Sequence, residues 1–183
     1  MSNGESSYRR YLDGDDQGLM EIIRDYKDGL IFFLCGFTRD IAEAEELCED
    51  TFVKLAVNKP EFKGLSSFKT FLYTIARNTA LDWKRIRRPY VSLDNVSELE
   101  ADERSLEEEY LREERRISVR RALEKLKDNY REVLWLTYFE ELSNKETAAV
   151  MGKSVHGIET LVYRARNALK KQLEKEGFTY ENI

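Results

Sequence analysis

Few residues in this 183-residue chain have the type and spacing that covalent chemistry requires. The single histidine, His156, stands at the start of an expected helix, where exposure or contact with a phosphate or base fits better than acid–base catalysis. The run Gly152-Lys153-Ser154 matches the end of a phosphate-binding loop, but Thr147 occupies the position of that loop's first glycine. Cys35 and Cys48 lack metal-ligand or redox spacing and are expected to be buried, reduced thiols. The sequence therefore predicts no enzyme, no metal site and no cofactor.

Charged side chains are distributed in a way that indicates nucleic-acid chemistry instead. Residues 62–88 hold seven cations and one acid, and residues 143–175 hold seven cations and three acids. Residues 89–116, with ten acids and four arginines, separate these basic blocks, and residues 1–61 carry a net charge of −7. The overall charge of −5 argues against nucleic acid, but the distribution of charge matters more than its sum. Two basic blocks predict two DNA contacts on one chain.

Residues 143–173 predict two helices joined by a tight turn, and this pair positions the second basic block. Ser143 and Glu146 form a capping box that starts the first helix, Gly152 ends it, and Ser154 caps the second. One apolar stripe recurs along the second helix with helical spacing: Ile158, Val162, Ala165, Leu169 and Leu173. Such a helix–turn–helix, with a polar outer face, fits the major groove of B-DNA.

The outer face of the second helix decides between two interpretations of this motif. Capping signals alone are equally typical of a helical hairpin inside an ordinary bundle. The face opposite the apolar stripe presents hydrogen-bonding side chains: Glu159, Thr160, Tyr163, Arg164 and Asn167. A basic cluster follows the same helix: Arg164, Arg166, Lys170 and Lys171. This cluster favours DNA binding over the hairpin interpretation.

Residues 15–88 predict an all-helical first domain. The apolar residues of two successive helices keep helical spacing before a break at Lys59-Pro60. The second of these helices has an acidic outer face: Glu43, Glu46, Glu49 and Asp50. Acids without matching lysines one turn away are either a solvated face or a docking surface for a basic partner, and the residues alone leave both readings open.

A further helix, from about residue 67 to residue 88, interleaves aromatic and basic side chains. Such a pattern suits single-stranded DNA, where bases stack on rings and phosphates meet cations. Phe68, Leu72 and Ile75 are better explained as core residues at helical spacing. Phe62 lies in a loop containing glycine and serine and is harder to explain as core. A loop aromatic beside a basic helix can hold a base that has left the stack.

The chain thus divides into an N-terminal helical domain (residues 1–88), an acidic linker (89–116) and a C-terminal helix–turn–helix domain (117–183). As a relaxed coil the linker spans only ~30 Å, whereas two DNA sites two helical turns apart are ~70 Å distant. We therefore hypothesise that a partner surface holds the linker extended. The apolar run at residues 29–37 is too short to span a bilayer, and the N-terminus lacks a signal-peptide core, so a cytoplasmic location is expected.

Three motifs in this order resemble the bacterial RNA polymerase sigma factors of the extracytoplasmic-function type, within the sigma-70 family. Residues 43–52 resemble the family's helix that docks on the polymerase clamp, residues 62–82 its segment that melts and reads the −10 element, and residues 142–166 its −35-reading domain. The resemblance implies an all-α fold of two small helical domains and a non-enzymatic role in promoter recognition. It also implies three partners: core polymerase, through its clamp and flap surfaces, promoter DNA, and an anti-sigma factor.

The resemblance assigns roles to individual residues. Polymerase docking falls to Glu43, Glu46, Glu49 and Asp50. Contacts at −10 fall to Phe62, Lys63, Ser67, Arg77, Asn78, Lys84, Arg85 and Arg88, with Phe62 and Asn78 around a flipped base. Contacts at −35 fall to Ser154, His156, Glu159, Thr160, Tyr163, Arg164 and Arg166. The free protein is expected to bind promoter DNA poorly, because neither domain alone makes many contacts.

The sequence also departs from the family pattern. Phe71 stands where tryptophan is frequent, and His156-Gly157 where a glycine–threonine pair is frequent. Glu159 stands where basic or small residues are usual; it cannot contact phosphate favourably but can accept a hydrogen bond from cytosine N4, which predicts an unusual −35 preference. Two other functions compete with the sigma-factor reading. One is a stand-alone helix–turn–helix regulator, and the other is a helical interaction scaffold without a DNA role.

Overall fold

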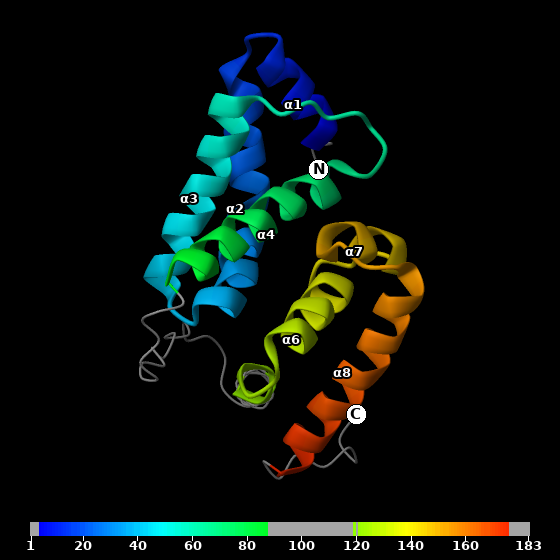
Figure 1. The fold of residues 1–183 in the computed structure, drawn as a ribbon. Helices are drawn as coiled ribbons and strands as arrows, with labels where there is room; N and C mark the ends of the chain where they lie inside the picture. Colours follow the sequence, from blue (N-terminus) through cyan, green and yellow to red (C-terminus); the bar gives the residue numbers. More distant parts are fainter. Residues whose placement is uncertain (1–3, 88–118, 120, 176–183) are drawn as a thin grey trace, which may run out of the picture.

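A computed structural model describes residues 4–87, 119 and 121–175 of the chain, and every regular element within these residues is a helix (Figure 1). The predicted all-α class, with two small helical domains, is confirmed. The predicted linker, residues 89–116, lies outside the described residues, as does Arg88.

Four helices form the N-terminal domain: α1 (Gly4–Leu12), α2 (Asp16–Thr38), α3 (Ile41–Asn58) and α4 (Phe68–Arg87). Asp15 and Asp40 cap α2 and α3, each accepting a hydrogen bond from a backbone N–H of the first turn. The loop between α3 and α4 begins at Lys59, in a left-handed conformation that ends the helix before Pro60. The break expected at Lys59-Pro60 is therefore present, and the basic helix starts within one residue of its predicted position.

Helix α1 precedes the region where the sequence predicted the first helix. Its two tyrosines are buried and hydrogen-bond to the end of α3 and to the loop that follows it. The hydroxyl of Tyr8 donates to the carbonyl of Pro60 over 2.8 Å, and that of Tyr11 donates to the carbonyl of Ala56 over 3.1 Å. The Tyr8 ring also contacts Phe68, with centroids 5.4 Å apart. Helix α1 thereby fixes both the loop before α4 and the start of α4.

The C-terminal domain contains α6 (Asp128–Leu134), a π-helical turn η1 (Trp135–Phe139), α7 (Asn144–Met151) and α8 (Val155–Lys175). The capping box of Ser143 and Glu146 forms as predicted at the start of α7. Gly152 ends α7 with φ +62°, a left-handed conformation that residues with a Cβ adopt only at a cost. The hydroxyl of Ser154 accepts from the Gly157 N–H and so caps α8. The predicted helix–turn–helix is present.

The two domains pack directly against each other. Buried residues of both halves belong to one continuous hydrophobic cluster. Helices α6 and α7 lie against α2 and α4, and both stand between α4 and α8 (Figure 1). The described helices include none with the length and hydrophobicity needed to cross a bilayer.

Candidate nucleic-acid interface

Helix α8 presents the polar face predicted to read the −35 element. Its apolar stripe faces α6 and α7: Ile158, Ala165 and Leu173 are buried, and Val162 and Leu169 are half-buried. Most of the predicted DNA side chains lie on the other side: Glu159, Tyr163 and Arg164 are exposed, and Thr160 is half-buried. Arg166 is exposed as well, but it flanks the apolar stripe and lines a groove with Leu169 and Leu173. The Tyr163 side chain in particular is 69% exposed. The face is therefore open to a groove of duplex DNA.

The start of α8 holds the remaining two residues predicted at −35. The Ser154 hydroxyl already accepts the cap hydrogen bond from Gly157, but its exposure leaves a donor for a phosphate. His156 is 91% exposed, with Nδ1 3.6 Å from a carboxylate oxygen of Glu159. The structure brings five of the seven predicted −35 residues to the outer face of α8, with Ser154 at its N-cap and Arg166 beside the apolar stripe.

The predicted −10 residues divide into two groups, and the first is open to solvent. Lys63, Asn78 and Arg85 are exposed. Lys63 lies 3.6 Å from Glu61, and Arg85 lies 3.2 Å from Asp82, both as exposed ion pairs of little strength. The structure therefore leaves these three side chains available to DNA.

Phe62 packs more closely than its loop position indicated. Its ring is half-buried against the hydrophobic core, 5.2 Å from the Phe71 ring and 5.8 Å from the Phe68 ring, centroid to centroid. Core packing therefore accounts for Phe62 better than the sequence suggested. Tyr8 of α1 packs against the same cluster of aromatic rings, with its ring centroid 6.0 Å from that of Phe71.

The second group of −10 residues contacts the C-terminal domain. The Arg77 Nε–H donates to Glu132 over 2.5 Å, and the Lys84 ammonium lies 2.5 Å from Asp128. The Ser67 hydroxyl donates to Glu146 over 2.7 Å. Arg77 and Glu132 are 17% and 8% exposed, so this pair is shielded from water. Burial raises the pKa of Glu132, and the guanidinium of Arg77 opposes that rise.

Glu140 is the centre of a polar network between the domains that the sequence did not indicate. Its carboxylate accepts from the indole N–H of Trp135 over 3.1 Å and lies 2.7 Å from the Lys69 ammonium. The Tyr73 hydroxyl also hydrogen-bonds to it, and burial raises the pKa of that phenol. Gly29 of α2 makes room, because a Cβ there would lie 2.7 Å from the Tyr73 oxygen. The π-helical turn η1 ends with the Glu140 N–H donating to the Trp135 carbonyl, directly before the side chain that reaches α4.

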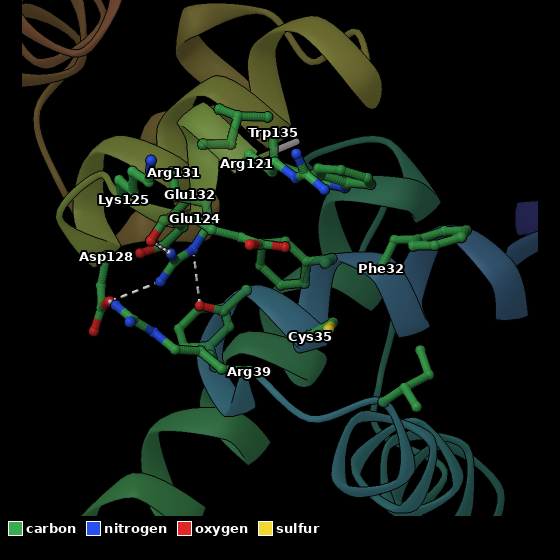
Figure 2. A pocket seen from close by; sticks show the side chains of 15 residues that line it. Phe32, Cys35, Arg39, Arg121, Glu124, Lys125, Asp128, Arg131, Glu132 and Trp135 are labelled. Atoms are coloured by element: carbon green, nitrogen blue, oxygen red, sulfur yellow. Dashed lines mark hydrogen bonds and ion pairs between the residues drawn. The ribbon is translucent and has the colours of Figure 1, made fainter. Parts of the chain in front are cut away.

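Arg131 and Asp128, in the first half of α6, form a second set of polar contacts between the domains. The Arg131 guanidinium is buried and donates to the Gly36 carbonyl of α2 over 3.0 Å and to Asp128 over 2.8 Å. Asp128 also lies 3.5 Å from Arg39, so it contacts cations of both domains. A cavity of about 410 Å³ opens beside these residues, with Phe32 and Trp135 on its far wall (Figure 2).

The acidic face predicted on α3 is present, with one change. Glu46, Glu49 and Asp50 are exposed, whereas Glu43 is half-buried and forms an ion pair with Arg87 of α4. Two apolar residues continue the exposed face toward the end of α3: Val53 is 55% exposed and Val57 is 73% exposed. An acidic patch beside exposed valines is typical of a docking surface. The described side chains include no group of three or more His, Cys, Asp or Glu that could hold a metal ion.

Comparison with known proteins assigns both domains to families. Residues 22–89 match Sigma-70 region 2, and residues 116–169 match Sigma-70, region 4. RNA polymerase sigma factor YlaC of Bacillus subtilis (strain 168) is 34% identical over 158 residues, which cover 85% of this chain and 91% of that protein. ECF RNA polymerase sigma factor SigW of the same organism is 30% identical over 170 residues, which cover 87% and 91%.

A solved structure agrees in fold. Sigma factor RpoE in complex with the anti-sigma factor NepR, from Bartonella quintana, has a TM-score of 0.70 and 25% identity, covering 85% of this chain and 96% of that one. The chain therefore belongs to the sigma-70 family, and it is an RNA polymerase sigma factor of the extracytoplasmic-function type. Sigma factors are initiation factors without enzymatic activity; they bind core RNA polymerase and promoter DNA. The regulator and scaffold alternatives are not favoured.

Proposed function

We propose that this sigma factor reads the −35 element through the exposed face of α8. The observation that carries the proposal is the arrangement of that face: Glu159, Tyr163 and Arg164 project to solvent from a helix whose other side is packed against α6 and α7. A helix held in this way can enter the major groove while its neighbours contact the backbone. In this proposal Arg164 donates to a guanine edge, and Glu159 accepts a hydrogen bond from cytosine N4. Arg166 and Ser154 contact phosphates.

At −10, the loop before α4 and the exposed side of α4 capture an unpaired base. Asn78 supplies the amide that recognises it, and the half-buried Phe62 offers the exposed part of its ring. Arg77 joins them once its ion pair with Glu132 of the C-terminal domain has broken. Lys63, Arg85 and Arg88 neutralise the phosphates of the opened strand. Unstacking a base costs a few kcal/mol, which stacking on a ring at ~1–3 kcal/mol per base and the phosphate contacts offset.

Two surfaces of the protein bind core polymerase. Because the polymerase is its partner, the protein works in the cytoplasm. Glu46, Glu49 and Asp50 with the neighbouring valines of α3 meet the clamp. A groove between η1 and α8 meets the flap; it measures about 510 Å³, and its apolar lining includes Leu134, Tyr138 and Leu169. Tyr163 and Arg166 of the −35 set also line it, so the flap and DNA sites adjoin. Tyr138 is 53% exposed in it, which indicates a surface able to accept an apolar helix of a partner.

An anti-sigma factor is a further expected partner of this chain. The solved relative from Bartonella quintana is a sigma factor in complex with an anti-sigma factor. Affinity purification of the tagged protein from its own cells, followed by mass spectrometry, should recover such a partner in addition to polymerase subunits.

Binding to purified core polymerase tests the clamp surface. The double substitution Glu49→Lys and Asp50→Lys should abolish co-purification with core polymerase, because it reverses the charge of an exposed patch without touching the core. The double substitution Asp13→Lys and Glu174→Lys makes the same change of charge at exposed positions away from α3; it is the matched control and should leave co-purification unchanged. Undiminished binding of the double variant would exclude α3 as the clamp contact.

A further inference from the structure

Helix α1 precedes the part of the chain that matches Sigma-70 region 2, which begins at residue 22. One of its side chains nevertheless reaches the loop before α4. Tyr8 is fully buried, and its hydroxyl donates to the Pro60 carbonyl over 2.8 Å. Because solvent does not reach Tyr8, this side chain cannot touch DNA itself. Any effect that it has on promoter recognition must pass through the loop.

We propose that Tyr8 is a positioning residue for base selection at −10. It holds residues 60–66, which we call the −10 loop, in the conformation that offers Phe62 to an unpaired base. A recognition site selects well only when the residues behind it fix its geometry. The inference rests on the −10 role proposed above for Phe62 and Asn78, and it adds α1 to the elements that determine which base is captured.

The −10 loop has few other anchors. In the described part of the chain, residues 60–66 take part in no backbone–backbone hydrogen bond. Tyr8 donates the one hydrogen bond that the loop accepts from described residues outside it. At the tip of the loop, Leu65 is 87% exposed, and a Cβ on Gly64 would meet no atom within 4 Å. The position of the loop therefore depends on its first residues, Pro60 and Phe62.

The ring of Tyr8 also supports Phe62. Phe62 packs on Phe68 and Phe71 of α4, with ring centroids 5.8 Å and 5.2 Å apart. The Tyr8 ring contacts the same two residues, at 5.4 Å from Phe68 and 6.0 Å from Phe71. One tyrosine thus holds the backbone of the loop through its hydroxyl and the rings beneath Phe62 through its own ring. Both anchors of the loop depend on it.

Helix α1 is held firmly enough to act as such a support. The Ser7 hydroxyl donates to Glu21 of α2 over 2.6 Å, and Arg10 lies 2.5 Å from the same carboxylate. The two helices approach so closely at Gly18 that a Cβ there would lie 2.1 Å from the Ser7 carbonyl oxygen. The Tyr8 hydroxyl therefore has a defined position relative to the rest of the domain, and it passes that position to the loop.

Two variants of the full-length protein test the inference. Tyr8→Phe removes only the hydroxyl and keeps the ring contacts, so the variant should fold. Tyr11→Phe is the matched control, because it makes the same change one turn later in α1. It removes a hydrogen bond of 3.1 Å to the Ala56 carbonyl, which belongs to α3 and not to the loop. Thermal melting followed by circular dichroism compares their stabilities, and the assays are run well below both melting temperatures.

The first measurement determines base selection by the holoenzyme. Core polymerase with each variant is mixed with a pool of random duplexes, each continuing into a random single-stranded extension of one strand, and the bound DNA is sequenced. The wild type should prefer one base at a fixed distance from the junction, which core polymerase alone should not. Tyr8→Phe should weaken this preference ~2- to 10-fold, the range for one hydrogen bond, and Tyr11→Phe should not. A merely structural role would lower the amount of DNA bound and leave the preference unchanged.

The second measurement needs no DNA. Lys63 is an exposed trypsin site within the −10 loop. Cleavage of a folded protein by a protease follows the population in which the cleaved segment has left its native position. Tyr8→Phe should therefore accelerate cleavage after Lys63, followed by mass spectrometry, by ~2- to 10-fold. Tyr11→Phe should leave this rate unchanged.

Any of three results would overturn the inference: an unchanged base preference in the Tyr8→Phe holoenzyme, an equal loss of preference in Tyr11→Phe, or unchanged cleavage after Lys63. Failure of the proposed function is detected separately, with Asn78→Ala in the same selection. If Asn78→Ala keeps the wild-type preference while Tyr8→Phe loses it, the role of Asn78 is wrong and the positioning role of Tyr8 stands. If the wild type shows no preference beyond that of core polymerase, both fall.

Discussion

The substitution Asn78→Ala should lower promoter opening more than polymerase binding. Asn78 is exposed on α4, and its side chain makes no hydrogen bond among the described residues. Its removal therefore leaves the fold intact, and the free energy of unfolding should change by less than ~0.5 kcal/mol. Because Asn78 lies outside the face that Glu132 and Asp128 cover, the packing of the two domains should be unaffected as well.

The expected loss of function follows from the hydrogen bonds that an amide can make. An asparagine side chain pairs with a base edge through at most two hydrogen bonds, and each contributes ~0.5–1.5 kcal/mol net. Losing both should cost ~1–3 kcal/mol, which lowers formation of the open promoter complex ~5- to 150-fold. Co-purification with core polymerase should be unchanged, since the polymerase contacts that we propose lie elsewhere, on α3 and in the groove between η1 and α8.

The assay follows both quantities on the same holoenzyme preparation. Permanganate reactivity of unpaired thymines reports promoter opening, and co-purification reports polymerase binding. Asn129→Ala makes the same side-chain change at an exposed position of α6 and should leave both unchanged. Equal loss of opening and of polymerase binding in the Asn78 variant would refute the assignment of Asn78 to the base.

Three further outcomes are expected. Arg164→Ala should remove the protection of the −35 element in a footprint of the holoenzyme. Binding of the −10 element on a template that is already unpaired there should persist. An unchanged −35 footprint would contradict the docking of α8. Gly152→Ala should lower stability by ~1 kcal/mol, because a Cβ there meets no neighbour and only the left-handed backbone costs energy. The melting temperature should fall by ~2–4 °C, less for Gly152→Asn, and an unchanged melting temperature would show that the turn is not held as described. Burial raises the pKa of the Cys48 thiol to about 11, so iodoacetamide at pH 8 should alkylate it far more slowly in the native protein than in urea, and equal rates would place Cys48 at the surface.

The helix–turn–helix could be predicted from sequence because its signals are local. Ser143 and Glu146, which form the capping box, are only three residues apart. Gly152 marks the end of α7, because glycine adopts the left-handed conformation more readily than any other residue. The apolar stripe of α8 then determines which side chains face outward, so the predicted −35 residues share one face except Arg166, which flanks the stripe. Each of these inferences needs only residues within two or three helical turns of one another.

The contacts between the domains could not be predicted, because they join residues far apart in the chain. Arg77 and Glu132 are separated by 55 positions, and neither has a neighbour that signals the pairing. The same holds for Phe62, whose loop composition indicated exposure while Phe68 and Phe71 hold it by packing. The π-helical turn before Glu140 was likewise not predicted, because π-helical turns are rare and the apolar spacing of residues 135–139 does not distinguish them from an α-helix.

Transcription by the reconstituted holoenzyme tests the central claim most directly. Purified core polymerase is combined with the wild-type protein, and run-off transcripts are sequenced from a library of fragments of the source genome. We expect discrete start sites that appear only when the protein is present and that share upstream −35 and −10 sequences. Transcript profiles indistinguishable from those of core polymerase alone, across the whole library, would contradict the account.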